Sequence, residues 1–222
     1  MTVDSVTEFY GSRADLYDRI ATAPGVGRWR RAAAARVAEP GATVVEMGCG
    51  TGANLPHLRE RVGPEGRVVG VDITGPLLER ARAHTAAFDN VGVVRGDARR
   101  PPIGAADAVL ATFVCGMFED PAAVVDRWCD LVGSGGRIAL MNATETTEPV
   151  GRPLNPPFRA FTALSAPTMG PIDAVGAVVG ATELPLTRRV SAARDALVAR
   201  TVDRRYETFA LGFVGLLSGR VR

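Results

Sequence analysis

The amino-acid sequence predicts an α/β protein built on a parallel β-sheet. Between residues 43 and 142, short β-branched segments alternate with segments of helical period, which is the pattern of consecutive β-α-β units. Three glycines, Gly48, Gly50 and Gly52, fall within five positions between the first of these strands and the first helix. The length of 222 residues, 46% of them hydrophobic, suits one domain of this class with appended segments.

Five strands are expected in this region, each a short run rich in β-branched residues. They are residues 43–47, 67–72, 91–96, 107–112 and 137–142. Helices are expected between them because apolar residues recur at three- and four-residue spacing, as in Leu55, Leu58 and Val62. Another helix is bounded by Asp120, an N-cap residue followed by proline, and by Gly133 after its last turn.

Further segments are expected on either side of this core. The single domain expected over residues 1–222 divides into a helical cap (1–38), a sheet core (40–142), a lid with a helix (143–205) and a terminal element (206–222). The lid begins with a proline-rich stretch typical of a long functional loop with a short helix. Its later helix is expected from Ser191 to about Arg204. The terminal element fits either one helix or two strands that turn near Gly212.

Composition excludes several classes of function. With 26 basic and 24 acidic residues and a formal net charge of +2, no basic surface for nucleic acid is predicted. The chain contains no lysine, which excludes mechanisms that use a Schiff-base or P-loop lysine. Three cysteines without C-x-x-C spacing support neither a disulfide framework nor a zinc site, and no metal is expected. No apolar run approaches the roughly 20 residues of a transmembrane segment, so we expect a cytoplasmic protein.

The glycine-rich turn and the acids near it predict a site for an adenosine-bearing ligand. A helix N-terminus offers unpaired N–H groups and a partial positive charge, and glycines let a ligand approach the backbone. Glu46, two residues before the first glycine, would repel a pyrophosphate but attract a cationic ligand. Asp72 ends the second strand, where a carboxylate can accept both ribose hydroxyls. Asp97 follows the third strand and suits an adenine amino group.

Two other functions compete with a cationic cofactor. Gly48, Gly50 and Ala53 satisfy the dinucleotide fingerprint G-x-G-x-x-G/A, so a nicotinamide-dependent oxidoreductase is an alternative. Gly52 lies one position earlier than a dinucleotide site requires, and together with Glu46 it favours S-adenosylmethionine. A third hypothesis is a non-catalytic module that keeps a cofactor-binding fold.

Five segments in series resemble the motifs of class I S-adenosylmethionine-dependent methyltransferases. They read VVEMGCGTGANL, VVGVDIT, VVRGDARRPP, ADAVLATFVCGMF and LVGSGGRIALMN. The resemblance implies a Rossmann-like, seven-stranded, mostly parallel sheet flanked by helices, with a reversed final hairpin. It implies S-adenosyl-L-methionine as cofactor and methyl transfer as activity. The segment LYDRIATAPGVGRWRR is similar to the entry helices of ubiquinone and menaquinone C-methyltransferases, although those enzymes usually carry Asp where Glu46 stands.

The resemblance also implies which residues hold the cofactor. They are Tyr17 in the cap, Glu46, Gly48, Cys49, Gly50 and Gly52 after the first strand, Asp72 and Ile73 after the second, Asp97 and Ala98 after the third, and Thr112 and Phe113 after the fourth. Thr112 and Phe113 are expected to face the methyl group, and Cys49 to fill space in the turn. No catalytic base is assigned, because displacement at a sulfonium-activated carbon depends mainly on alignment.

The expected acceptor is a small, apolar molecule, quinone-like or lipid-like, held beneath the proline-rich lid. Two arginines of that lid, Arg152 and Arg159, are candidates to meet an anionic acceptor.

Overall fold

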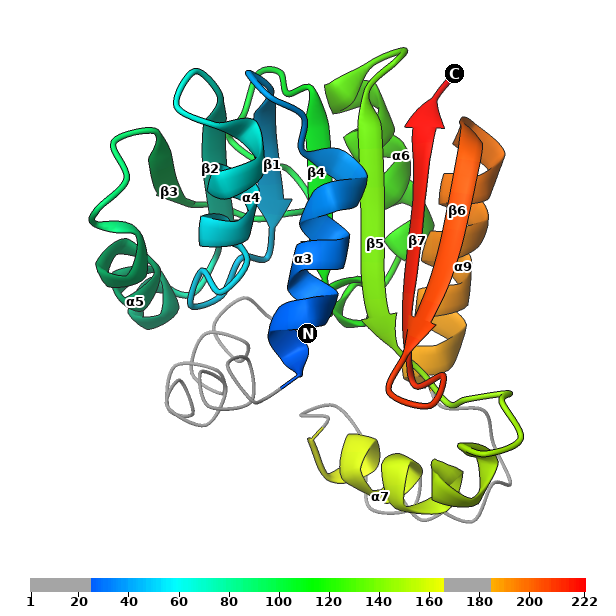
Figure 1. The fold of residues 1–222 in the computed structure, drawn as a ribbon. Helices are drawn as coiled ribbons and strands as arrows, with labels where there is room; N and C mark the ends of the chain where they lie inside the picture. The colour runs from blue at the N-terminus through cyan, green and yellow to red at the C-terminus, as the bar shows by residue number, and fades with distance from the viewer. Residues whose placement is uncertain (1–24, 166–184) are drawn as a thin grey trace.

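One seven-stranded sheet organises the computed structural model, which describes residues 25–165 and 185–222 (Figure 1). The strands are β1 (Thr43–Met47), β2 (Arg67–Asp72), β3 (Val91–Arg95), β4 (Ala108–Thr112), β5 (Arg137–Ala143), β6 (Thr201–Phe209) and β7 (Val214–Val221). Their order across the sheet is β3-β2-β1-β4-β5-β7-β6. Neighbours from β3 to β5 are parallel, whereas β7 is antiparallel to both β5 and β6. The predicted mostly parallel sheet with a reversed final hairpin is confirmed.

Helices cover both faces of the sheet. The helical elements are α3 (Val26–Val37), α4 (Leu55–Val62), α5 (Gly75–Thr85), η1 (Cys115–Met117), α6 (Pro121–Val132), η2 (Arg152–Leu154), α7 (Asn155–Ser165) and α9 (Pro185–Arg200). Helices α3, α4 and α5 pack on one face, and α6 and α9 pack on the other (Figure 1). Each face therefore closes its own hydrophobic cluster, as a three-layered α/β protein requires.

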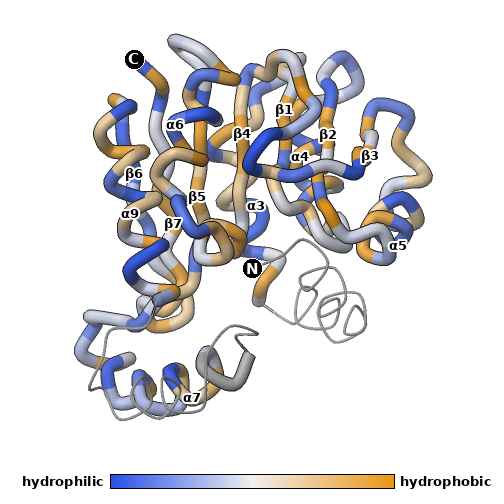
Figure 2. The backbone as a smooth tube through the Cα atoms, turned by 180° about the vertical axis from the view of Figure 1, so that it is seen from behind, coloured by the Kyte–Doolittle hydropathy of each residue, from blue (hydrophilic) through white to orange (hydrophobic). Residues whose placement is uncertain are grey.

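The middle strands are buried on both faces. All five residues of β4 are buried, as are residues 138–142 of β5. Figure 2 shows mainly hydrophobic colouring along both strands. Such continuous apolar runs are typical of parallel strands with helices on both sides.

Alternation along β5 assigns its side chains to one face or the other. Ile138 and Leu140 belong to the cluster under α6 and α9, whereas Ala139 and Met141 belong to the cluster under α3. Because successive strand residues point to opposite faces, Asn142 lies on the α9 side.

The same rule places the acid of β1. Val45 and Met47 join the cluster under α6 and α9, and Val44 joins the cluster under α3. Glu46 therefore lies on the α3 side, near the carboxyl edge of the sheet, where ligands bind in open α/β folds. Two buried polar side chains, Glu46 and Asn142, thus lie near this edge on opposite faces.

The predicted strands match the structure closely. The bounds of β1 and β2 are as predicted, and those of β3, β4 and β5 differ by one residue each. The helix predicted after Asp120 is α6: the Asp120 carboxylate accepts a hydrogen bond from the Ala123 N–H at 3.0 Å, and Gly133 ends the helix with a φ of 68°. Local capping chemistry therefore determined this element.

The predicted end of the last helix is wrong. α9 ends at Arg200 rather than near Arg204, and β6 begins at Thr201, five residues before the expected terminal element. The charged sequence around Arg204 is compatible with a helix, but Thr201 and Val202 pair with Val221 and Arg220 of β7. Long-range pairing overrides local helical preference here.

Residues 206–222 form strands rather than a helix. β6 and β7 are joined by a short turn that contains Gly212, whose φ is 86°. The structure thus selects the second of the two predicted alternatives.

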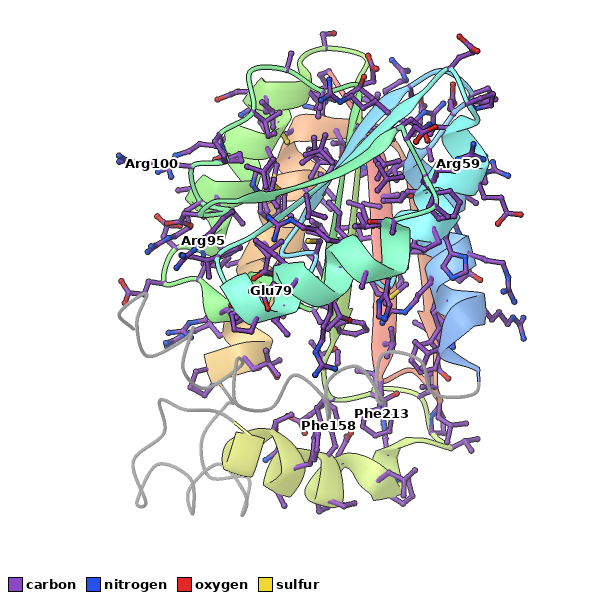
Figure 3. The ribbon with its side chains drawn as sticks, turned by 90° about the vertical axis from the view of Figure 1, so that its left-hand side faces the viewer. Arg59, Glu79, Arg95, Arg100, Phe158 and Phe213 are labelled. Atoms are coloured by element: carbon purple, nitrogen blue, oxygen red, sulfur yellow. The ribbon has the colours of Figure 1, made fainter. Side chains whose placement is uncertain are left out.

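Helix α7 carries the proline-rich segment beyond the carboxyl edge of the sheet (Figure 1). Phe158 of this helix packs against Phe213 in the β6–β7 turn, with ring centroids 4.9 Å apart, and Figure 3 shows the two rings together below the sheet. Asn155 anchors the start of α7 through two hydrogen bonds of 3.0 Å with the backbone of Thr146. The predicted short helix in the lid is present.

The predicted N-terminal cap is described only from residue 25. Within it, α3 corresponds to the last part of the predicted helical cap. Tyr17 lies outside the described residues. Among the helices of residues 25–165 and 185–222, none is both long and apolar enough to cross a membrane.

Candidate functional site

The glycine-rich turn after β1 is tied to the end of β2. Gly48, Gly50 and Gly52 have φ values of 70°, 55° and 79°, a region that side-chain-bearing residues rarely adopt. The N–H of Gly48 donates to the Val71 carbonyl at 2.8 Å, and the N–H of Gly50 donates to the Asp72 carboxylate at 2.8 Å. The turn therefore requires glycine for its backbone conformation.

The three glycines differ in what a side chain would meet. A Cβ at Gly48 would lie 2.8 Å from Val114, and one at Gly52 would lie 2.9 Å from Ala81. A Cβ at Gly50 would have no neighbour within 4 Å. Two of the glycines thus let secondary elements pack closely, and only Gly50 borders open space of the kind that a ligand could use.

Cys49 fills space within this turn, as predicted. Its buried side chain lies over Gly70 of β2, where an added Cβ would come within 2.7 Å of the sulfur. Its N–H donates to the Val71 carbonyl at 3.0 Å, and its carbonyl accepts from Gly52 at 2.9 Å. Cys49 therefore shapes the turn with both its side chain and its backbone.

Glu46 lies at the centre of a buried polar network. Its Oε1 accepts hydrogen bonds from the Asn54 amide and from the Thr112 hydroxyl, the latter at 3.3 Å. Asn54 also donates to Thr112 at 3.0 Å and accepts from Nη1 of Arg30 at 2.8 Å. The network joins α3, β1, the start of α4 and the end of β4.

The second oxygen of Glu46 has no hydrogen-bond partner within the described part of the chain. The side chain is fully buried, and Oε2 is exposed neither to solvent nor to a donor. Burial raises the pKa of Glu46 to about 7, against the opposing effects of Asn54, the Arg30 charge and Thr112. A buried acceptor without a donor is costly, which marks Oε2 as a position for a cationic ligand group.

Asp72 supports the turn through its carboxylate. One oxygen accepts from the Gly50 N–H and the other from the Thr74 N–H at 2.9 Å. Burial raises its pKa, and the backbone hydrogen bonds act in the opposite direction. The Thr74 side chain and the Ile73 N–H also donate to this carboxylate, so a ligand hydroxyl would compete with groups of the turn. Ile73, the next residue, accepts from the Arg95 side chain through its carbonyl at 3.2 Å.

Asp97 is engaged by a neighbour in the sequence. Its carboxylate pairs with Nη2 of Arg99 at 2.7 Å and also accepts from the Arg99 backbone N–H at 2.8 Å. Burial acts to raise the pKa of Asp97, but the hydrogen bonds from Arg99 outweigh it and the pKa is lowered. The next arginine, Arg100, points away from the protein (Figure 3). An adenine amino group would therefore share Asp97 with Arg99.

Ala98 lies beside this pair and is buried. Its carbonyl accepts a hydrogen bond from the indole nitrogen of Trp128 at 2.8 Å. Trp128 of α6 thereby holds the segment after β3 against the sheet.

Thr112 and Phe113 lie where β4 ends. Thr112 is buried and belongs to the Glu46 network, whereas Phe113 is 41% exposed. The φ of Phe113 is 59°, which is unusual for a bulky residue and stores backbone strain. Its N–H donates to the Met141 carbonyl at 2.7 Å, and this hydrogen bond holds the strained residue at the carboxyl edge.

Two residues of the network were not predicted from the sequence. Asn54 occupies an N-cap position but makes no capping hydrogen bond, because its side chain turns toward Glu46 instead. Its position within the glycine-rich segment could have marked it as a candidate site residue. Arg30 lies in an alanine-rich helix and is buried, and no local pattern distinguishes it from the exposed arginines beside it.

The two lid arginines are engaged within the protein. Arg159 pairs with Glu145 at 2.6 Å, and Arg152 donates to the Thr147 carbonyl at 3.0 Å. These contacts do not direct either arginine toward the Glu46 network. Across residues 25–165 and 185–222, no group of His, Cys, Asp and Glu side chains could hold a metal ion.

Comparison with known proteins assigns a family to this fold and site. Residues 44–136 match the family model described as "Methyltransferase domain". Nocamycin O-methyltransferase of Saccharothrix syringae is 39% identical over 147 residues, which cover 64% of this chain and 46% of that protein. Aklanonic acid methyltransferase DauC of Streptomyces sp. (strain C5) is 31% identical over 159 residues, which cover 69% of each protein. The matched part thus spans less than half of the first relative and about two thirds of the second.

Solved structures agree on the fold. A putative methyltransferase of Haloferax volcanii, solved in complex with a methyltransferase activator, has a TM-score of 0.68 at 19% identity and covers 97% of both chains. Human N-acetylserotonin methyltransferase in complex with S-adenosylmethionine has a TM-score of 0.65 at 17% identity, covering 97% of this chain and 58% of that one. At such identities the likeness concerns the fold alone. Taken with the sequence relatives, it shows that the chain belongs to the class I S-adenosylmethionine-dependent methyltransferases.

Proposed function

We propose that this protein binds S-adenosylmethionine at the carboxyl edge of β1, β2 and β4 and transfers its methyl group to a small organic acceptor. The observation that carries the proposal is the buried Oε2 of Glu46, which lacks a donor among the residues of the described ranges. The cofactor carries an ammonium and a sulfonium group, and either would give this oxygen the cationic partner that the described residues do not provide. A dinucleotide pyrophosphate would add negative charge beside a carboxylate.

The proposed contacts follow the chain from Glu46 outward. Glu46 receives the methionine ammonium, and the Arg30 guanidinium, which already reaches Asn54, offers a positive charge for the methionine carboxylate. Gly50 borders the open space needed beside the turn. Gly48 and Gly52 hold the turn in shape, and the Asp72 carboxylate, where β2 ends, meets the ribose hydroxyls.

The adenine and methyl ends complete the proposed site. Asp97 and Ala98 after β3, with Ile73 after β2, border the adenine. Thr112 and Phe113 after β4 border the reactive methyl group. Tyr17, predicted to close over the cofactor, remains a proposal because it lies outside the described residues.

The chemistry demands little from the protein beyond positioning. The sulfonium of the cofactor supplies the activation, since its carbon is already a good electrophile. What the chain contributes is a fixed geometry and exclusion of water, and proximity alone contributes about 7–11 kcal/mol in favourable cases. Phe113 is held in a strained conformation at the edge of the sheet, and its exposed ring is available to cover the transfer path. No side chain is assigned as a base.

The acceptor we propose is small and largely apolar, quinone-like or lipid-like. Exposed apolar side chains gather on α7 and its neighbours beyond the carboxyl edge: Leu154, Phe161 and Leu211 are 47%, 60% and 49% exposed. The relatives' names specify small acceptors, among them nocamycin, aklanonic acid and demethylmenaquinone. These names support a small-molecule acceptor rather than a macromolecule.

Calorimetric titration tests the cofactor assignment. The parent protein should bind S-adenosylmethionine and its demethylated product, S-adenosylhomocysteine, and should not bind NADH. Glu46→Gln should weaken binding, whereas Glu60→Gln, a change to an exposed glutamate on α4, should leave binding unchanged. Binding of NADH in place of both methionine derivatives, by a folded sample, would contradict the proposal.

A further inference from the structure

A second set of buried polar atoms lacks hydrogen-bond partners, and it lies away from Glu46. Both polar atoms of the Asn142 side chain, Nε and Nη2 of Arg194 and Oγ1 of Thr187 are buried without a nitrogen or oxygen partner in the part of the chain that the structure describes, and the Cys115 thiol beside Asn142 is a weak hydrogen-bonding group. Asn142 is 1% exposed. Native proteins rarely leave such atoms unsatisfied, so a group of them calls for a ligand.

These side chains converge between β5, β7 and α9. Asn142 pairs with Gly215 across the β5–β7 ladder, and side chains at paired positions project from the same face with Cβ atoms roughly 4.5–5.5 Å apart. Nη2 of Arg194 lies 2.6 Å from the position that a Cβ of Gly215 would occupy. The Arg194 guanidinium therefore occupies the space beside Asn142 that a side chain at position 215 would fill.

Two further contacts define this cluster of polar side chains, which comprises Asn142, Thr187 and Arg194. Thr187 precedes Arg194 by seven residues on α9, so both lie on the same face of that helix. The Arg194 guanidinium lies over the Tyr206 ring at 5.5 Å, which fixes its orientation. Glycine at position 215 is required because the Tyr206 hydroxyl would also approach a Cβ there.

These side chains carry the positive charge of Arg194, which is half-buried and has two buried guanidinium nitrogens. No carboxylate of residues 25–165 or 185–222 forms an ion pair with Arg194. The buried thiol of Cys115 lies beside these side chains. Burial raises its pKa to about 12, while a hydrogen bond with the Asn142 side chain and the Arg194 charge act to lower it. Two buried guanidinium nitrogens without a counter-ion among the described residues are unfavourable, and an anion at this position would relieve the cost.

The geometry of the free atoms selects the kind of anion. Nε and Nη2 are on one edge of the guanidinium, and their N–H bonds run parallel, which matches the two oxygens of a carboxylate. Asn142 adds one donor and one acceptor for a neighbouring hydroxyl or carbonyl group. The unpartnered atoms thus form a fork for a carboxylate with a polar neighbour.

We infer that Arg194 and Asn142 bind a carboxylate of the methyl acceptor, so that the preferred substrate is a small organic acid. This inference rests on the proposed function, because it places the carboxylate next to the proposed methyl position. Asn142 follows Met141, whose carbonyl accepts from the N–H of Phe113 and which pairs with Thr112 of β4. The apolar side chains beyond the carboxyl edge would then contact the rest of the acid.

Matched probes test whether this cluster binds a carboxylate, without knowledge of the natural acceptor. Binding of benzoate and of benzamide, which share a shape and differ in charge, is measured by calorimetry on protein saturated with S-adenosylhomocysteine. The parent should prefer benzoate by at least about tenfold, the scale of one charge-assisted bidentate contact. Arg194→Met should abolish the preference, and Arg194→Lys, which keeps the charge and loses the fork, should reduce it.

Controls separate this inference from the proposed function. Arg188→Met removes an exposed arginine from the same helix and should keep the benzoate preference. All variants should still bind S-adenosylhomocysteine, because Arg194 and Asn142 lie on the opposite face from Glu46. Failure of the parent to bind S-adenosylhomocysteine would reject the proposed function, and benzoate is then measured on the protein alone. Equal affinity of the parent for benzoate and benzamide, or a preference unaltered in Arg194→Lys and Asn142→Leu, would overturn the inference that this cluster binds a carboxylate.

Discussion

Arg30 and Asn54 are joined by a hydrogen bond of 2.8 Å between Nη1 of the arginine and Oδ1 of the amide. The bond links α3 to the residue that precedes α4 and orients the Asn54 amide toward Glu46 and Thr112. One amide thus connects a positive charge, a carboxylate and the end of β4.

Removal of this amide should weaken cofactor binding. Hydrogen bonds to charged groups contribute about 1.5–3 kcal/mol, so Asn54→Ala should lower affinity for S-adenosylmethionine by about 10- to 100-fold in calorimetry. Asn90→Ala serves as control, because Asn90, the residue before β3, donates to the carbonyls of Gly63 and Gly66 before β2. It should lower stability and leave affinity unchanged; an equal loss of affinity in both variants would show a general loss of structure instead.

Cofactor affinity should depend on pH through Glu46. In the free protein its pKa is raised to about 7, so the carboxyl is largely protonated below that pH. A cationic ligand requires the carboxylate, and binding therefore releases a proton. Affinity should rise with pH up to about 7 and then level off, with a slope approaching about tenfold per pH unit below it. Glu46→Gln should remove the dependence, and a titration series across pH checks both; a flat profile in the parent would contradict it.

The same group should shape the stability of the ligand-free protein. A raised pKa means that the protonated form is favoured in the folded state. Its contribution is fully present below the ordinary value of 4.5 and is lost as the pH rises through about 7. Thermal melts at several pH values should show the parent losing stability relative to Glu46→Gln over this window, at up to about 1.4 kcal/mol per pH unit. A gain in the parent's stability relative to Glu46→Gln as the pH rises would instead mean that Glu46 is ionised in the folded protein at low pH.

Substitution of the glycines in the turn should have different effects on stability and on cofactor binding. Gly52→Ala combines a left-handed φ with a contact of 2.9 Å to Ala81, whereas Gly50→Ala meets only the φ penalty of about 1–2 kcal/mol. Denaturant unfolding should therefore show the larger stability loss for Gly52→Ala. Calorimetry should show loss of S-adenosylmethionine binding in Gly50→Ala while the protein remains folded. Normal binding by Gly50→Ala would remove Gly50 from the proposed site.

Asn142 should be a residue whose removal stabilises the protein. Its two polar atoms are buried without a nitrogen or oxygen partner in the described ranges, and the Cys115 thiol beside them is a weak hydrogen-bonding group. Such burial costs about 1–3 kcal/mol, so Asn142→Leu should raise the free energy of unfolding and the Tm of the ligand-free protein. Asn155→Leu is the matched control, since Asn155 bonds twice to Thr146 and its loss should destabilise. A lower Tm for Asn142→Leu would show that the amide is satisfied within the chain.

Short-range patterns in the sequence determined most of the sheet. β-branched runs located β1 and β2 to the residue, and the pair of Asp120 and Gly133 located the ends of α6. The positions of Glu46 and Asp72 at strand ends also followed, because parallel strands bring their carboxyl ends to one edge. These features depend on neighbours in the chain, which is why periodicity and capping residues reveal them.

Only the tertiary structure decided how distant side chains share this edge. The bridge from Arg30 through Asn54 to Glu46 and the strand that begins at Thr201 have no periodic signal. Two of the three glycines needed for the turn serve packing against Val114 and Ala81, which are far away in sequence. Asn142 and Arg194 meet because β7 lies beside β5 and α9 lies over both. Such contacts arise from the assembled sheet, since the energies that create them act between segments that local sequence cannot relate.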